Sequence, residues 1–201
     1  MNNKASSKTR MEIAQLAAKF LAVEGASDYL AAKRKAALQL GVHPDKGMPT
    51  NVEVEQALIG YQSLFQNRQQ VEHLYDLRCK AVNAMRMLSL YWPRLVGPVL
   101  TGTATRHSEI ILHLISDEPE LIGFLLDDNA IPYNSCTRTV KTGRTEKKEY
   151  PAYRFIADRT SIILVIFPER QKHLCPLSTI TGKPMRRASV GEVEKLLGVY
   201  E

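Results

Sequence analysis

The chain has 201 residues, 44% of them hydrophobic and 24% charged, with a formal net charge of +6 at pH 7. This is enough apolar material for one or two globular domains with real cores, and the mild basic excess permits a nucleotide or nucleic-acid partner without requiring one. Its apolar runs are all shorter than the ~18 residues of a membrane-spanning helix, and the first residues lack the apolar stretch of a signal peptide, so we expect no membrane partner.

Residues 1–92 are predicted to form a helical region. Apolar residues at helical spacing predict a first helix over about 9–23 and a second over about 28–40, the latter capped by Ser27 or Asp28. Thr50 and Glu53 have the spacing of a capping box. A long helical pattern follows them, with a polar break near 66–67, and ends before Pro93.

A short motif, His43-Pro44-Asp45-Lys46, lies in the loop between the second and third predicted helices. It resembles the motif of J-domain co-chaperones, and the helix before it carries a basic run at 33–35. That resemblance implies that residues 43–45 contact an Hsp70 partner. The same four residues also arise by chance, and an Asp at that place can cap a turn, so both interpretations stay open.

Residues 93–201 are predicted to form a sheet domain. In chain order the pattern indicates strands at 95–101 and 109–115, a helix ending near 128, strands at 131–141 and 149–157 joined by a turn at 141–144, a buried strand at 162–167, and a short helix that begins at Ser189. This order predicts an α+β protein whose mixed sheet has helices on one side.

A small-residue turn joins the first two predicted strands. It contains Thr101-Gly102-Thr103, continues to Arg106, and leads into the second strand through Ser108 and Glu109. Gly102 has no Cβ, so a ligand or another backbone segment can approach closely. The neighbouring threonine hydroxyls can donate to phosphate oxygens.

These residues resemble the signature of the polymerase-beta-type nucleotidyltransferase superfamily, and the layout also resembles a group of small bacterial proteins. In the superfamily a strand ends in Gly-Ser or Gly-Thr, a turn with an Arg follows, and the next strand opens with Ser-Asp-x-Asp. The resemblance implies that Gly102, Thr103, Arg106 and Ser108 bind a nucleoside triphosphate. It also implies that Glu109 is the catalytic residue and binds Mg²⁺, with RNA or a protein hydroxyl as the acceptor.

One departure from the superfamily changes the expected chemistry. Ile111 occupies the position of the second carboxylate, and a single Glu is a poor site for Mg²⁺. Two hypotheses follow. The protein is either an active nucleotidyltransferase that lacks the second carboxylate, or a catalytically inactive protein that keeps the fold and binds nucleotide or RNA. A third carboxylate is not assigned, because Asp158, the only Asp near the late strands, is expected at a strand end.

The remaining candidate residues are cysteines and hairpin cations. Three cysteines without a Cys-x-x-Cys pair indicate reduced thiols in the cytoplasm, and His173 with Cys175 does not complete a zinc site. The turn between the late strands is basic. Its cations are expected either to follow an RNA backbone or only to be solvated: Arg138, Lys141, Arg144, Lys147 and Lys148.

Overall fold

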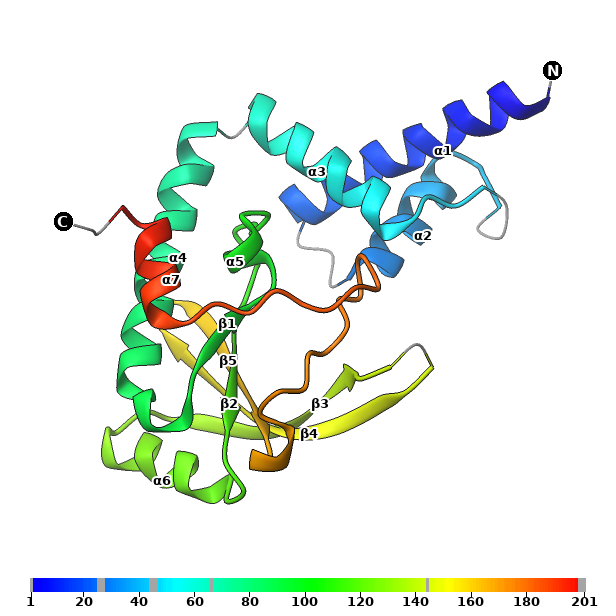
Figure 1. Ribbon diagram of the computed structural model, residues 1–201. Coiled ribbons are helices and arrows are strands. Elements are labelled where there is room, and N and C mark those ends of the chain that lie inside the picture. The colour runs from blue at the N-terminus through cyan, green and yellow to red at the C-terminus, as the bar shows by residue number, and fades with distance from the viewer. Residues whose placement is uncertain (1, 25–27, 44–46, 66, 144, 199–201) are drawn as a thin grey trace. The chain divides into compact units, whose positions relative to one another are not determined.

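The computed structural model describes residues 2–24, 28–43, 47–65, 67–143 and 145–198 as an α+β protein with a five-stranded mixed sheet (Figure 1). The chain divides into two compact units. The first contains the residues up to Glu72 together with Thr105–His107 and Thr179–Thr181, and the second contains the rest. Among the described residues, every helix is too short or too polar to be a membrane-spanning segment.

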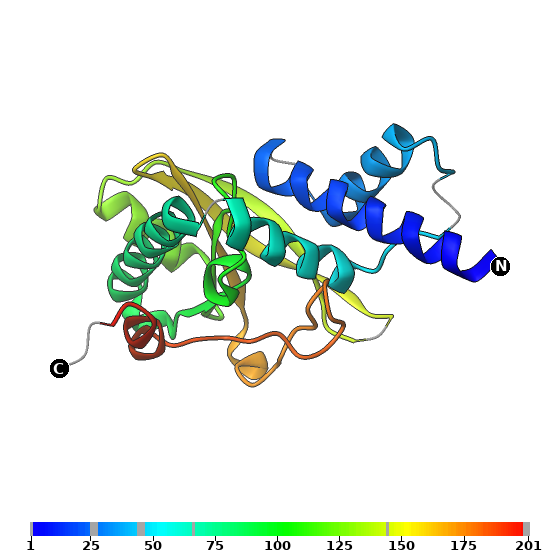
Figure 2. The same cartoon turned by 90° about the horizontal axis from the view of Figure 1, so that it is seen from above.

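The first unit is helical. Its elements are α1 (Asn2–Lys19), which continues into a π-helical turn (Phe20–Glu24), α2 (Tyr29–Gln39), α3 (Asn51–Phe65) and the beginning of α4 (Asn67–Met87). α1 packs against both α2 and α3 (Figure 2). The core is rich in alanine, which lets helix axes approach closely, and its fully buried residues include Ile13, Ala17, Ala32, Ala36 and Val54.

Side-chain caps start two of these helices where the sequence predicts them. The carboxylate of Asp28 accepts a hydrogen bond from the N–H of Ala31 at 2.6 Å. The carboxylate of Glu53 accepts the N–H of Thr50 at 2.7 Å, while the Thr50 hydroxyl accepts the N–H of Glu53 at 3.2 Å. The predicted capping box is therefore confirmed.

The second unit is built on the sheet, in the order β1-β2-β5-β4-β3. β2 and β5 are parallel, and the other neighbouring pairs are antiparallel. The strands are β1 (Arg94–Val96), β2 (Ile110–Ile115), β3 (Tyr133–Lys141), β4 (Lys147–Ala157) and β5 (Thr160–Phe167). The helices are the remainder of α4, α5 (Pro98–Thr101), α6 (Glu120–Asp128) and α7 (Val190–Leu196).

The two faces of the sheet have different surroundings. α4, α5, α6 and α7 pack on one face, around a large apolar cluster that includes Leu112, Leu114 and Leu164 (Figure 1). The other face carries a smaller cluster of Ile115, Tyr150, Ala152, Ile163, Val165 and Phe167. The prediction of a mixed sheet with helices on one side is therefore confirmed.

The first strand is shorter than the predicted 95–101. β1 ends at Val96 because Gly97 has a φ of 75°, and Pro98 then begins α5. Proline is favoured at the first position of a helix, where its missing N–H is not needed. α5 ends at Gly102, whose φ of 91° is in the left-handed region. The glycine that ends the strand is thus Gly97.

Candidate functional site

Glu109 lies just before β2 and is bound by groups from two later strands. Its Oε1 accepts a hydrogen bond from the Ser161 hydroxyl at 2.9 Å and lies 3.4 Å from Nη2 of Arg154. β2 and β5 are parallel with Ile110 opposite Ile162, which places Ser161 beside Glu109. The antiparallel pairing of β4 with β5 brings Arg154 close. We call Glu109, Arg154 and Ser161 the Glu109 cluster.

Mg²⁺ is the ion that the superfamily resemblance implies, and the Glu109 cluster does not fit it. Ile111 contributes no ligand, and the carboxylate of Glu109 is already paired with a guanidinium. His113 is on the same strand two residues further, but burial lowers its pKa to about 3, and neutral imidazole is a poor ligand for Mg²⁺. Among the described residues, no group of three or more His, Cys, Asp or Glu side chains could hold a metal ion.

The guanidinium of Arg154 gives the Glu109 cluster a different chemistry. The side chains of Arg154 and Glu109 are 46% and 30% exposed, so the pair is reached by solvent. Such an exposed pair adds little to stability, but it restricts the orientation of the guanidinium. Arginine has five N–H donors and binds phosphate in a bidentate manner, so donors remain for an anion.

The turn at Gly102 is packed against α4. Arg78 donates hydrogen bonds to the backbone carbonyls of Val99 at 3.2 Å and Leu100 at 3.4 Å, and burial lowers its pKa. A Cβ built on Gly102 would lie 3.8 Å from Leu74 and 3.9 Å from Arg78. A methyl group would therefore fit here, and the position requires glycine for its φ of 91° and not for close approach to α4.

The other predicted phosphate-binding residues have partners of their own. Thr103 is buried, and its hydroxyl lies 3.1 Å from that of Thr101. Arg106 belongs to the first unit, where Nη2 donates to the carbonyl of Val23 at 2.6 Å. Ser108 directly precedes Glu109 and is partly buried.

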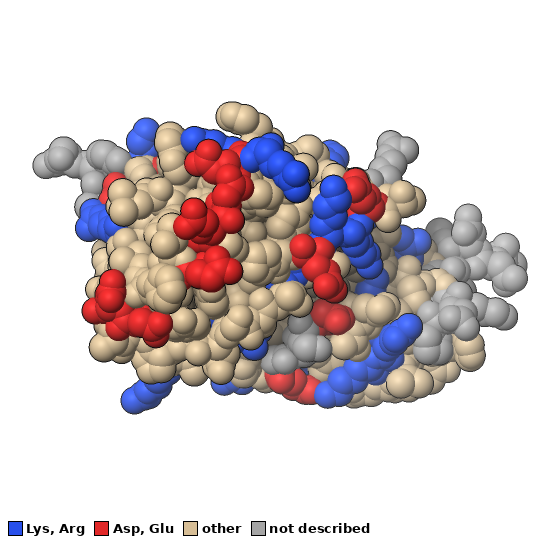
Figure 3. Space-filling model, turned by 90° about the horizontal axis from the view of Figure 1, so that it is seen from below, with Lys and Arg blue, Asp and Glu red and all other residues tan. Residues whose placement is uncertain are grey.

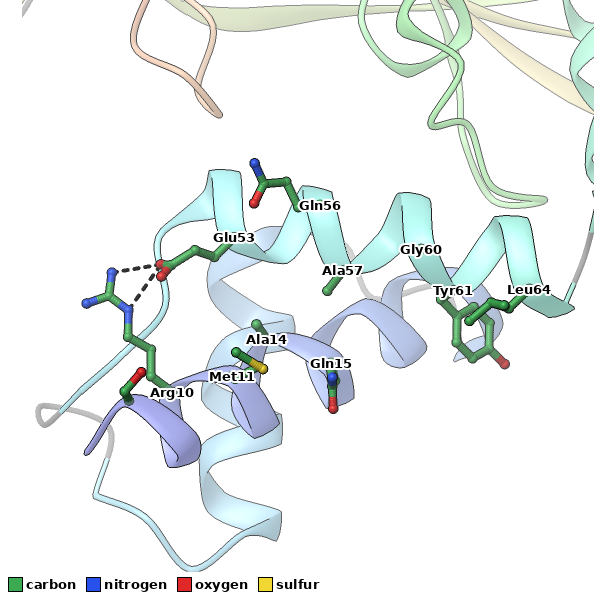
Figure 4. A pocket seen from close by; sticks show the side chains of 11 residues that line it. Arg10, Met11, Ala14, Gln15, Glu53, Gln56, Ala57, Gly60, Tyr61 and Leu64 are labelled. Atoms are coloured by element: carbon green, nitrogen blue, oxygen red, sulfur yellow. Dashed lines mark hydrogen bonds and ion pairs between the residues drawn. The ribbon is translucent and has the colours of Figure 1, made fainter. Parts of the chain in front are cut away.

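The first unit contains a cavity of about 570 Å³ between α1 and α3 (Figure 4). Small residues, Ala14, Ala57 and Gly60, line its middle. At one end Arg10 forms an ion pair with Glu53 at 2.7 Å, and the pKa of Glu53 is lowered to about 2 by the hydrogen bonds from Arg10 and Thr50. Arg10 donates to Glu53 through both Nε at 3.1 Å and Nη2 at 2.7 Å, whereas Arg154 has one contact with Glu109 at 3.4 Å. More donors of Arg154 therefore remain for a phosphate.

Two further predicted motifs lie partly outside the described residues. His43 is exposed in the loop after α2, but Pro44, Asp45 and Lys46 are not among the described residues. In the basic hairpin, Arg144 is also outside them, and Lys148 is paired with Glu146 at 3.1 Å.

The sequence pattern alone does not identify Arg154 or Ser161 as site residues, although the alternation along β4 indicates the face on which Arg154 lies. Tyr150, Ala152 and Arg154 alternate along β4 and therefore share a face of the sheet. Nothing in the local pattern shows which strand lies beside Glu109.

Comparison with known proteins assigns no family. A scan against family models and a search of curated proteins each found no match for the chain. Function is therefore inferred from the geometry of the Glu109 cluster.

Proposed function

We propose that this protein is a nucleotidyltransferase-like protein that binds the phosphates of a nucleotide through Arg154 and does not transfer the nucleotidyl group. One observation supports this above all: the carboxylate of Glu109 is held by Arg154 and Ser161. In the superfamily that the motif resembles, metal ions supply positive charge beside this carboxylate. Here the guanidinium of Arg154 supplies it.

The chemistry of transfer argues for binding without catalysis. Two-metal phosphoryl transfer needs carboxylates that hold both ions against the reacting oxygens. Ile111 stands where the resemblance places the second carboxylate, and Ser161, which lies beside Glu109, is not acidic either. An arginine binds and orients a phosphate, but its pKa is too high for it to accept a proton from an attacking hydroxyl.

Calorimetric titration with ATP, GTP, CTP and UTP tests this proposal. Arg154→Ala should weaken nucleotide binding about tenfold or more, since a charge-assisted hydrogen bond contributes about 1.5–3 kcal/mol. Arg68→Ala is the matched control, because it removes the same charge from a side chain that is 93% exposed in α4. Equal affinities for Arg154→Ala and the unaltered protein would contradict the proposal.

A further inference from the structure

A second pocket lies at the opposite end of the sheet from Glu109. β2 and β5 are parallel, so their carboxyl ends, at Ile115 and Phe167, meet at one edge. The segments that follow them, beginning at Ser116 and Pro168, line a pocket of about 480 Å³. Ligands of open α/β sheets bind at the carboxyl ends of the strands, and this volume is in the range of ligand pockets.

This pocket contains hydrogen-bond donors as well as acceptors. Arg170 lines it, is exposed, and forms no ion pair or hydrogen bond within the part of the chain that the structure describes. The hydroxyl of Tyr150 donates to Oε1 of Gln171 at 2.7 Å, which orients the amide and leaves its NH₂ group as a donor. The carboxylate of Asp117 accepts the N–H of Glu169 at 3.0 Å and keeps further acceptor sites.

Mixed charge is also visible on the surface drawn from below. Figure 3 shows both acidic and basic side chains on this surface. The lining of the pocket is itself mixed, with Lys148 and Arg170 beside Asp117 and Glu149. A ligand with both phosphates and polar base edges matches this lining.

Trp92 is connected to the edge of the pocket through Lys172. Lys172 directly follows the pocket-lining Gln171, and its Nζ lies 3.4 Å from the centre of the Trp92 ring. Trp92 itself is 52% exposed. Its φ of 51° is in the left-handed region, where Trp92 ends the 3₁₀ turn Ser89–Tyr91.

We propose that Trp92, Lys172, Arg170 and this pocket form a binding site for a single-stranded polynucleotide, which we call the Trp92 site. A base stacks on the face of the indole that Lys172 does not cover, Lys172 and Arg170 bind the adjacent phosphate, and the next nucleotide enters the pocket. Trp92 is not part of the pocket lining, so a ligand that uses both is longer than one nucleotide. Along β2, the Trp92 site is roughly 20 Å from Glu109, which makes it independent of the proposed nucleotide site.

Tryptophan fluorescence tests the Trp92 site directly, because Trp92 is the only tryptophan in the sequence. Unlabelled decauridylate RNA is titrated into the full chain. A second titration with the deoxyuridine oligonucleotide of the same length distinguishes RNA binding from DNA binding. We expect saturable quenching that weakens with salt, with a slope of about −0.7 for each phosphate contact. No change in emission at excess of either oligonucleotide would overturn the proposal.

Substitutions then separate stacking from a structural role. With a fluorescein-labelled oligonucleotide, Trp92→Ala should weaken binding about tenfold or more, and Trp92→Phe should restore part of it. Lys172→Ala leaves the ring in place and should reduce the salt slope by about 1. Tyr75→Ala is the control, because Tyr75 is also 52% exposed. Unchanged affinity in both Trp92→Ala and Lys172→Ala, with melting temperatures intact, would overturn the proposal.

Discussion

Glu109 has a guanidinium as its ion-pair partner, and this pairing determines what its carboxylate can do. Nη2 of Arg154 lies 3.4 Å from Oε1, and the Ser161 hydroxyl donates to the same oxygen. A carboxylate with these two partners orients the guanidinium of Arg154. A metal-binding carboxylate would instead need further acidic neighbours at coordination distance.

The substitution Glu109→Gln separates these two roles. The amide oxygen still accepts from Ser161, while the negative charge beside Arg154 is removed. We expect nucleotide affinity to be unchanged or to rise by a few-fold, because the carboxylate no longer competes with phosphate for the guanidinium, at about 1 kcal/mol for an exposed pair. Calorimetric titration measures this. If Glu109 were a metal ligand, Glu109→Gln would instead lower the affinity for nucleotide.

Gly102 supports a second prediction at the scale of one residue. Its φ of 91° is strained for any residue with a Cβ, although a methyl group would have room. Gly102→Ala should therefore lower the free energy of unfolding by about 1–2 kcal/mol. Gly60→Ala is the matched control in α3, where no atom lies within 4 Å of the added Cβ.

The control should change stability in the opposite direction. Alanine is favoured over glycine in a helix interior, so Gly60→Ala should raise the free energy of unfolding by about 0.5–1 kcal/mol. Urea denaturation followed by circular dichroism measures both variants. A Gly102→Ala protein as stable as the unaltered one would show that the left-handed conformation is not required.

At the scale of elements, the start of α3 depends on one carboxylate. The pKa of Glu53 is lowered to about 2 by hydrogen bonds from Arg10 and Thr50. An acid whose pKa is lower in the folded state stabilises the fold above its unfolded pKa, near 4.3, and loses this contribution as pH falls toward 2. Glu53→Gln should therefore be less stable at pH 7 by about 1 kcal/mol or less, and the difference should disappear near pH 2.

Glu55 in the same helix is the control for this pH dependence. Burial raises the pKa of Glu55, so its charged form opposes folding, and stability falls as pH rises through its titration. Glu55→Gln should consequently raise the melting temperature at pH 7. If both variants shifted the melting temperature in the same direction at pH 7, the assigned roles of the two carboxylates would be wrong.

Local chemistry explains which elements the sequence predicts well. The capping residues Thr50 and Ser189 mark the starts of α3 and α7, since each cap satisfies N–H groups within four residues. The alternation along β4 follows from the two-residue period of a strand. The predicted strand at 95–101 fails after Val96, because Gly97 and Pro98 favour the start of a helix more than the apolar residues favour a strand.

At the scale of the whole molecule, the candidate site depends on topology. The sequence places Glu109 at the start of a strand but does not show that β5 lies beside β2 or that β4 lies beside β5. Arg154 and Ser161 are therefore found only in the folded chain. The segments Thr105–His107 and Thr179–Thr181, which associate with the helical first unit, are another non-local feature that no local pattern shows.

The dependence of nucleotide affinity on Mg²⁺ distinguishes an arginine site from a metal site at Glu109. ATP is titrated into the full chain once with EDTA and once with excess Mg²⁺. Because Arg154 supplies the positive charge and Mg²⁺ neutralises phosphate, affinity in EDTA should equal or exceed that in Mg²⁺. Binding that appears only with Mg²⁺, and that Glu109→Gln abolishes, would contradict the account and indicate a working metal site.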